Sequence, residues 1–153
     1  MSVVKVSWLE MRASIGFAQT VDEYMEEFVT DAPGTPAPNL SAYEVAEDAG
    51  ELVCLGSYAN GELVGGCLLS VRYSPHYSKP IVTVDALFLR KKFRQGTRGY
   101  QLLCKAQAEA KALGAPGLCI SATPGSSLDR LCEITGWVEA RKVYFKPFGG
   151  EDE

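Results

Sequence analysis

An apolar strand, a turn rich in glycine and cations, and a long amphipathic helix follow one another between residues 83 and 114. Gly96 and Gly99 lack a Cβ atom, so the turn can direct several backbone N–H groups into one space. The helix adds unpaired N–H groups and the positive end of its dipole. Five cations crowd this segment in a chain of formal net charge −4: Arg90, Lys91, Lys92, Arg94 and Arg98. The segment therefore predicts a binding site for an anion, above all a phosphate.

Three kinds of phosphate-binding loop compete for this pattern. A P-loop ends in Gly-Lys-Ser/Thr, whereas this turn ends in Gly99-Tyr100. A dinucleotide-binding fold needs Gly-x-Gly-x-x-Gly early in a βαβ unit, and neither the spacing nor the position fits. The remaining pattern is RQGTRG at residues 94–99, after a strand and before a helix. It resembles the pyrophosphate loop of the GNAT superfamily of acyl-CoA-dependent N-acyltransferases.

The resemblance covers residues 51–148. Two apolar runs joined at Asn60-Gly61 predict a hairpin before the loop strand. After the loop helix the family continues with a strand, a short helix and a closing strand, and this chain offers GLCISATP, SSLDRLCEITG and WVEARKVYFKPF. We expect Gly136 to end the short helix in a left-handed conformation and Trp137 to begin the closing strand. More narrowly, Pro75-His76-Tyr77, FRQGTRG and YFKPF resemble GNAT proteins of bacteriophages and prophages.

The resemblance implies an α/β (α+β mixed) GNAT fold. Its central mixed, twisted sheet would have about six to seven strands, flanked by about four helices and splayed at strands 4 and 5. A length of 153 residues with 46% hydrophobic content suits a single domain over residues 1–153. Residues 1–50 would form an N-terminal strand and acceptor-side helices, residues 51–148 the cofactor-binding core, and residues 149–153 an acidic tail.

The N-terminal third has a legible pattern of its own. Residues 3–6 predict a first strand, and a capping box at residues 20–23 predicts the start of a helix. A loop rich in proline and glycine at residues 33–38 is expected to end that helix. Ser41 is expected to begin a second helix, from Tyr43 to about Asp48, that Gly50 stops. Both helices carry acid on their outer faces, which favours a cationic amine as the acceptor.

The resemblance implies transfer of an acetyl group from acetyl-CoA (coenzyme A) to a primary amine, by direct attack within a ternary complex. The acceptor could be a small molecule, a modified nucleotide or a protein amine. Backbone groups of Leu87 and Leu89 would pair with the pantetheine arm as an added strand does, and an N–H near Leu89 would face the thioester oxygen. The expected cofactor-binding residues are Leu87, Phe88, Leu89, Arg94, Gln95, Gly96, Thr97, Arg98, Gly99 and Tyr100, with Arg90, Lys91 and Lys92 as further contacts.

The attacking amine must be neutral, so the site needs a base. Asp85 is the first candidate because it interrupts the apolar run of the loop strand, and we expect it to be half buried there with a raised pKa. His76, the only histidine, is the alternative base or a proton shuttle. Tyr77, its neighbour in the loop before that strand, is a candidate substrate-binding residue together with Asp85. The thiolate could be protonated by Cys132, Tyr144 or water.

The chain departs from the family pattern at three positions. Thr97 stands where the loop usually has its middle glycine, Cys132 where many relatives carry a tyrosine acid, and Gly125 where an asparagine often contacts the cofactor arm. These departures leave a second function open. The chain could be an acyl-CoA-binding interaction or regulatory protein, with weak or lost catalysis and a phage origin.

Charge and cysteine usage limit the partners. A pI near 5.1 with one compact cationic cluster argues against direct binding of duplex DNA. No apolar run is long enough to span a bilayer and no signal peptide is visible, so a cytoplasmic protein without a membrane partner is expected. The five cysteines are widely spaced in apolar runs and predict reduced thiols without a metal site. The sequence leaves the oligomeric state open, although many members of the family form homodimers.

Overall fold

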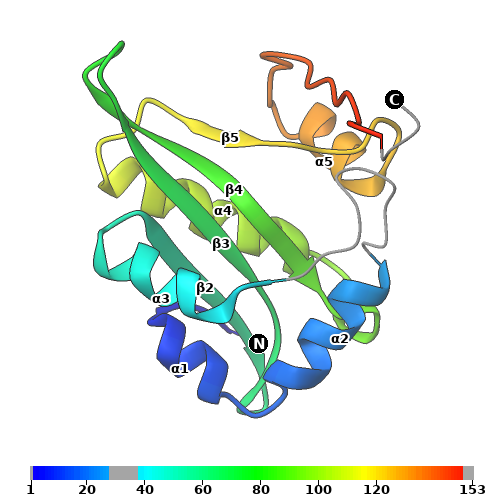
Figure 1. Ribbon diagram of the computed structural model, residues 1–153. Coiled ribbons are helices and arrows are strands. Elements are labelled where there is room, and N and C mark those ends of the chain that lie inside the picture. The colour runs from blue at the N-terminus through cyan, green and yellow to red at the C-terminus, as the bar shows by residue number, and fades with distance from the viewer. Residues whose placement is uncertain (1, 28–37, 150–153) are drawn as a thin grey trace.

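The computed structural model describes residues 2–27 and 38–149. These residues form a sheet of five strands in chain order, shown in Figure 1. The first four strands pair antiparallel and the last runs parallel to the fourth. The mixed sheet is therefore as expected, but it has fewer strands than the sequence led us to expect. The strands are β1 (Ser2–Val6), β2 (Leu52–Ala59), β3 (Glu62–Ser74), β4 (Lys79–Leu89) and β5 (Leu118–Ile120).

Helices cover both faces of the sheet (Figure 1). One face carries α1 (Trp8–Ala13), α2 (Phe17–Glu27) and α3 (Leu40–Asp48), and the other carries α4 (Arg98–Ala112). A short 3-10 helix, η1 (Lys91–Phe93), leads from β4 towards α4, and α5 (Ser127–Ile134) follows β5. The core divides accordingly into two clusters, one that includes Leu102 and Ala106 of α4 and one that includes Trp8 and Met11 of α1.

The hairpin between β2 and β3 is confirmed. Asn60 and Gly61 both have positive φ angles, of 52° and 77°. A two-residue turn of this type needs left-handed backbone at both positions, which asparagine and glycine adopt at low cost. This turn fixes which residues of β2 and β3 face each other, and so helps to fix the face that each side chain takes.

The N-terminal helices differ from expectation at their starts. Helix α1 was not predicted, although Ser7 and Glu10 form a capping box at its first turn. Thr20 does not cap α2 but lies buried inside it, where its hydroxyl donates a hydrogen bond to the carbonyl of Leu63 at 3.0 Å. The cap of α3 is Asn39 and not Ser41. Ser7 and Asn39 are therefore caps that the sequence analysis did not identify, whereas Thr20 has the chemistry of a cap but a partner that is distant in the sequence.

The C-terminal segment contradicts the expected closing strand. Helix α5 lies in the segment where a short helix was expected, with Ser126 as its cap, and Gly136 has the expected left-handed backbone with φ 87°. Beyond it, however, the described residues 137–149 form neither helix nor strand. Alternation alone does not make a strand, because a strand also needs an edge to pair with. Val138 and Tyr144 are accordingly 86% and 87% exposed.

Two expected features lie outside the described residues. They are most of the proline- and glycine-rich loop at residues 33–38 and the acidic tail beyond Gly149. Among the helices that the structure describes, none is long and apolar enough to cross a membrane.

Candidate active site

A β-bulge interrupts the pairing of β3 with β4. Leu69 pairs with Val84 and Leu68 pairs with Ala86, so Asp85 is an extra residue without a partner on β3. Side chains alternate along a strand, which directs Asp85 to the face opposite Val84, and the bulge then keeps Ala86 on that same face. Val84 belongs to the core cluster of the α4 face, whereas Ala86 lines a cavity on the other face. The bulge thus places Asp85 beside this cavity.

The same strand parts from β5 at this point. Parallel pairing covers only three residue pairs, the last of them Val84 with Ile120. Farther along, the backbone N–H of Arg90 donates to Val64 of β3 at 2.9 Å. Because residues of an antiparallel strand alternate in direction, Leu87 and Leu89 turn their N–H and C=O groups away from β3 and towards the gap. Among the described residues, β4 therefore continues from Asp85 to Leu89 without a paired residue on β5.

The turn after β4 ends at the N-terminus of α4. Gly96 has a φ of 67°, which favours glycine at this position. Thr97 occupies the cap position without a side-chain capping bond. The first backbone hydrogen bond of the helix is donated by Gln101 to Thr97 at 2.8 Å. The N–H groups of the first turn, at residues 98–100, therefore point out of the helix end, as an anion site requires.

Two of the five cations are already paired inside the protein. The side chain of Arg90 is 6% exposed and lies 2.6 Å from Glu23 and 2.9 Å from Glu62. Arg94 forms a two-pronged ion pair with Glu27 and donates from Nε to the carbonyl of Leu89 at 2.6 Å. We therefore remove Arg90 from the expected coenzyme contacts and give Arg94 a structural part. The exposed Lys91 and Lys92 and the half-buried Arg98 remain as cations for an anion.

These ion pairs also change the interpretation of the acidic residues on the N-terminal helices, which were expected to favour a cationic amine as the acceptor. Glu23 and Glu27 of α2 are taken by Arg90 and Arg94. Glu47 of α3 accepts hydrogen bonds from the backbone N–H of Trp8 at 2.8 and 3.1 Å. The three carboxylates dock helices onto their neighbours, so they do not indicate a cationic acceptor.

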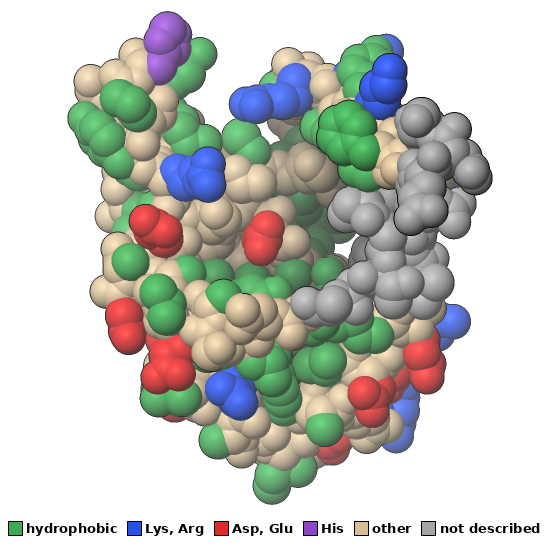
Figure 2. All heavy atoms as spheres, viewed as in Figure 1, with side chains coloured by type: hydrophobic (Ala, Val, Ile, Leu, Met, Phe, Trp, Pro, Cys, Tyr) green, Lys and Arg blue, Asp and Glu red, His purple; other side chains and the backbone are tan. Residues whose placement is uncertain are grey.

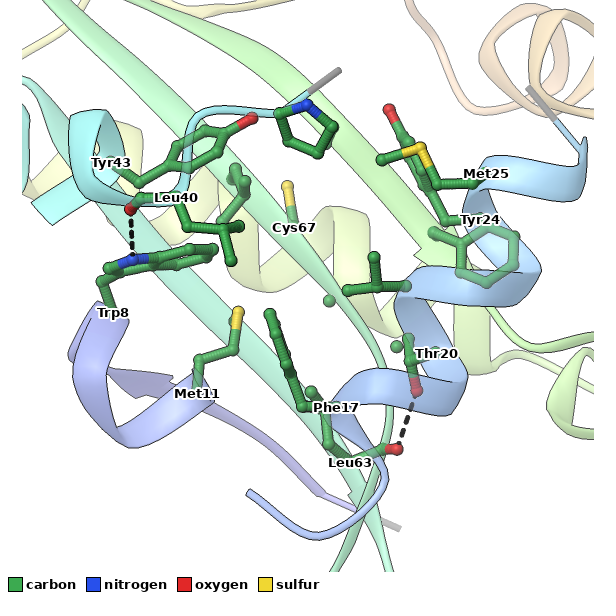
Figure 3. Close-up of a pocket in the computed structure, with 17 residues that line it drawn as sticks. Trp8, Met11, Phe17, Thr20, Tyr24, Met25, Leu40, Tyr43, Leu63 and Cys67 are labelled. Atoms are coloured by element: carbon green, nitrogen blue, oxygen red, sulfur yellow. Dashed lines mark hydrogen bonds between the residues drawn. The ribbon is translucent and has the colours of Figure 1, made fainter. Parts of the chain in front are cut away.

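The cavity beside Asp85 has a volume of about 130 Å³ and lies between the N-terminal helices and the sheet. Figure 3 shows side chains from α1, α2 and α3 converging on β3. Aromatic rings meet there in edge or tilted contacts, with centroid distances of 4.8 Å between Trp8 and Tyr43 and 5.5 Å between Tyr24 and Phe88. On the surface, green hydrophobic side chains show through the hollow of this face in Figure 2. The cavity is thus mainly apolar, and five of the seventeen residues that line it are aromatic.

Two phenols that line the cavity, those of Tyr24 and Tyr43, lie near the carboxylate of Asp85, which does not itself line the cavity. Burial raises the pKa of Tyr24, and the nearby Tyr43 and Asp85 raise it further. Burial and then Asp85 raise the pKa of Tyr43 in the same way. Asp85 itself is exposed, so the expectation of a half-buried carboxylate is wrong. The reason is the bulge, which turns the residue out of the paired ladder.

The structure does not bring His76 and Tyr77 to this place. Both are exposed in the turn between β3 and β4, where their rings contact each other at 4.7 Å. The single histidine is the purple side chain at the tip of the projecting hairpin in Figure 2. From the start of β4 at Lys79 to Asp85 the strand rises about 20 Å at about 3.3 Å per residue. His76 therefore cannot act on the same proton as Asp85 in this arrangement.

The candidates for protonating a thiolate also lie elsewhere. Cys132 is half buried on α5, and burial followed by the charge of Asp129 raises the pKa of its thiol. It does not line the cavity. Tyr144 belongs to the exposed C-terminal segment. Gly125 has a φ of 80° and donates its N–H to Asp129 at 2.7 Å, which makes it part of the start of α5.

Sequence reasoning missed the residues that line the cavity. Trp8, Phe17, Tyr24 and Tyr43 come from three helices that are separate in sequence, and none of them had been assigned to a site. Phe88 had been assigned to the cofactor, whereas its side chain lines the cavity. The one available signal was the concentration of aromatic residues in the N-terminal third, which is equally typical of a core.

Comparisons with known proteins identify the fold. No family model matches this sequence, and no curated protein matches it. Among solved structures, ribosomal-protein-alanine N-acetyltransferase from Brucella melitensis biovar Abortus 2308 superposes with a TM-score of 0.71 at 16% identity, over 97% of this chain and 100% of that one. The aminoglycoside N-acetyltransferase AAC(6')-Iy in complex with CoA gives 0.71 at 17% identity, over 96% and 93% of the two chains.

An aminoglycoside acetyltransferase from an uncultured soil metagenomic sample, in complex with trehalose, gives a TM-score of 0.76 at 13% identity, over 96% of this chain and 95% of that one. The fold of this chain is therefore that of the GNAT N-acetyltransferases. None of these three matches is described as a phage protein, so they lend no support to the narrower phage-type resemblance.

Proposed function

We propose that this protein transfers an acetyl group from acetyl-CoA to a primary amine that enters the cavity beside β4. The observation that carries the proposal is the position of Asp85. Asp85 is the extra residue of the bulge, next to Ala86, which lines the cavity, and it follows the last residue of β4 that pairs with β5. A gap on one side of the strand and a cavity on the other would let two reactants meet across it. The fold shared with N-acetyltransferases supports the same reaction class.

The residues around the gap fit coenzyme A. Leu87 and Leu89 would offer backbone groups to the pantetheine arm, although the carbonyl of Leu89 already accepts from Arg94. The turn and the first turn of α4 would hold the pyrophosphate, with Lys91 and Lys92 nearby. When bound, acetyl-CoA supplies the acetyl group as a thioester. The residues proposed for the phosphate groups are Gln95, Gly96, Thr97, Arg98, Gly99 and Tyr100.

Asp85 would act as the base in this proposal. Its exposed carboxylate can accept the proton of the attacking amine directly or through one water molecule. Cys132 and Tyr144 have no role in the proposed transfer, because coenzyme A can leave as a thiolate that water protonates.

We further propose that the chain acts as one domain.

The alternative is a non-catalytic acyl-CoA-binding protein, for which helices filling the acceptor side would have been the expected sign. The cavity between α1, α2 and α3 is open, with about 130 Å³ of free volume. This observation favours the enzyme.

Calorimetric titration with coenzyme A and desulfo-coenzyme A tests the proposal first. We expect both to bind wild-type protein and Arg98→Ala to weaken binding about tenfold, which corresponds to about 1.4 kcal/mol. Lys111→Ala is the matched control, because Lys111 lies in the last turn of the same helix. Steady-state transfer to primary amines follows. A wild-type protein that binds neither compound would refute the acetyltransferase proposal.

A further inference from the structure

We infer that the acceptor is a primary amine on a compact apolar body, with an aromatic ring as the best fit. The inference rests on the proposed function, because it takes the cavity between the N-terminal helices and β3–β4 as the acceptor side. It goes further by naming the chemistry of the acceptor. Three features of the cavity support it: its size, the engagement of its polar atoms, and the position of its charge.

The size of the cavity suits one ring. Its volume is about 130 Å³. Apolar protein cavities of roughly 150 Å³ hold a benzene molecule. Trp8, Phe17, Tyr24, Tyr43 and Phe88 supply the ring contacts, and aromatic pairs favour offset or edge-to-face packing. An aromatic guest can continue the edge contacts that these residues already make with one another, such as the T-shaped pair of Trp8 and Phe17 at 5.9 Å.

Polar atoms in the floor of the cavity are already engaged. The indole N–H of Trp8 donates to the carbonyl of Leu40 at 3.0 Å, and the hydroxyl of Thr20 donates to that of Leu63 at 3.0 Å (Figure 3). A polyhydroxylated amine would lose its hydrogen bonds to water here and would find few replacements. Burying an unpaired hydroxyl costs about 1–3 kcal/mol. The cavity therefore disfavours an aminoglycoside, despite the fold that the chain shares with aminoglycoside acetyltransferases.

The charge lies at one end of the cavity. Tyr24 and Tyr43 approach Asp85 closely enough to feel its charge, and their hydroxyls lie towards the same end of the cavity in Figure 3. An ammonium group would be drawn to this end by the carboxylate, while the rings hold the apolar part. The reacting nitrogen would then lie next to the bulge of β4, where the strand opens towards the gap.

A fluorescence titration tests the inference independently of catalysis. The chain has two tryptophans, so Trp137→Phe leaves Trp8 in the cavity as the single reporter. We expect 2-phenylethylamine to give a saturable change in Trp8 emission. Ethanolamine lacks the ring and sisomicin is polyhydroxylated, and both should bind at least tenfold more weakly. 2-Phenylethanol keeps the ring without the ammonium group and measures the contribution of charge.

Variants locate the binding. Ala86→Leu fills the cavity from β4 and should weaken the binding of 2-phenylethylamine at least tenfold. Val21→Phe, which fills the cavity from α2, is a second variant for use if the first fails to fold. Asp85→Asn should weaken the amine and leave 2-phenylethanol unchanged. Glu139→Gln, a charge removal on the exposed C-terminal segment, is the control and should change neither.

The outcomes separate this inference from the proposed function. Protein that binds coenzyme A but prefers ethanolamine or sisomicin, or that binds none of the amines, would overturn the apolar acceptor and leave acetyl transfer standing. If the protein binds 2-phenylethylamine in the cavity but does not bind coenzyme A, the inference that the cavity binds apolar amines stands and the proposed acetyltransferase function is refuted. If the Asp85→Asn variant binds both the amine and the alcohol as wild type does, the inference that the Asp85 carboxylate attracts the ammonium group is wrong.

Discussion

The Nε atom of Arg90 lies 2.6 Å from a carboxylate oxygen of Glu23 and joins the end of β4 to α2. Its Nη1 atom lies 2.9 Å from Glu62 at the start of β3. A guanidinium group that is 6% exposed thus fastens a helix of the cavity wall to two strands. The shape of the cavity depends on this contact, because Phe17, Tyr24 and Met25 of α2 line it.

Removing the partners of Arg90 should be strongly non-additive. Glu23→Gln or Glu62→Gln alone leaves one carboxylate, and each should cost about 1 kcal/mol of unfolding free energy. The double variant leaves a buried charge without a counterion and should cost about 3–5 kcal/mol. Urea unfolding of the four proteins measures the coupling. Glu26→Gln, an exposed change on the same helix, is the control, and simple additivity would contradict the shared role.

The pair of Glu27 and Arg94 should make stability depend on pH. The hydrogen bonds and charge of Arg94 hold the pKa of Glu27 below its ordinary value of 4.5, against the opposing effect of burial. A pKa lowered by folding adds stability above the ordinary value, and that stability is lost as the pH falls through the folded pKa. Glu27→Gln should therefore destabilise the protein at pH 7, by less than about 1 kcal/mol because the pair is partly exposed.

The difference between wild type and Glu27→Gln should shrink steadily below pH 4.5. Chemical denaturation at several pH values between 7 and 3 measures it. A difference that stays constant or grows with acidity would contradict the ion pair.

Two cysteines should resist thiol reagents in the folded protein. Burial, reinforced by Glu47, raises the pKa of Cys54 to about 12, and burial followed by Cys54 raises that of Cys67 to about 12. At pH 8 only about one thiol in 10⁴ would be ionised at either position. Both side chains are fully buried, which blocks access as well. Peptide mapping after alkylation should find Cys54 and Cys67 modified only in denaturant, and fast native modification of either would contradict their burial.

Asp85→Asn tests the proposed base. We expect kcat/KM for the best amine to fall by about 10² to 10⁴, since general base catalysis contributes about this much. Coenzyme A affinity, measured by calorimetry, should stay unchanged. Glu139→Gln is the control for a charge removal that should leave activity intact. A larger loss in His76→Ala than in Asp85→Asn would transfer the role of base to the hairpin.

Local sequence chemistry predicted the elements that local interactions fix. The Asn60-Gly61 hairpin, the strand predicted at residues 3–6, the loop helix and the left-handed Gly136 all follow from short-range backbone preferences. Thr20 shows the limit of such reasoning. A threonine three residues before a glutamate has the pattern of a cap, yet its hydroxyl is used by Leu63, 43 residues away.

The candidate site could not be predicted from single segments, because it depends on how neighbouring strands and helices pair. The bulge at Asp85 is a mismatch of register between β3 and β4, which neither strand shows by itself. The same holds for the cations, whose pairing depends on how α2 docks. Arg90 and Arg94 looked like Lys91 and Lys92 in the sequence, but carboxylates from α2 engage only the first two. The closing strand failed for a related reason, because residues 137–149 have a strand-like pattern but no paired neighbour.

The strand order of the sheet has a consequence for how the chain folds. Strands β2, β3 and β4 are consecutive hairpins, so their contacts close short loops and can form early. Strand β5 can pair with β4 only after α4, which connects the two strands, has packed across the sheet, and the pairing then covers only three residue pairs. We expect the antiparallel meander to act as the folding nucleus and β5 to dock last. The gap proposed for coenzyme A would then be bordered by the slowest and least secured part of the chain, where a ligand that bridges both strands could contribute most to completing the fold.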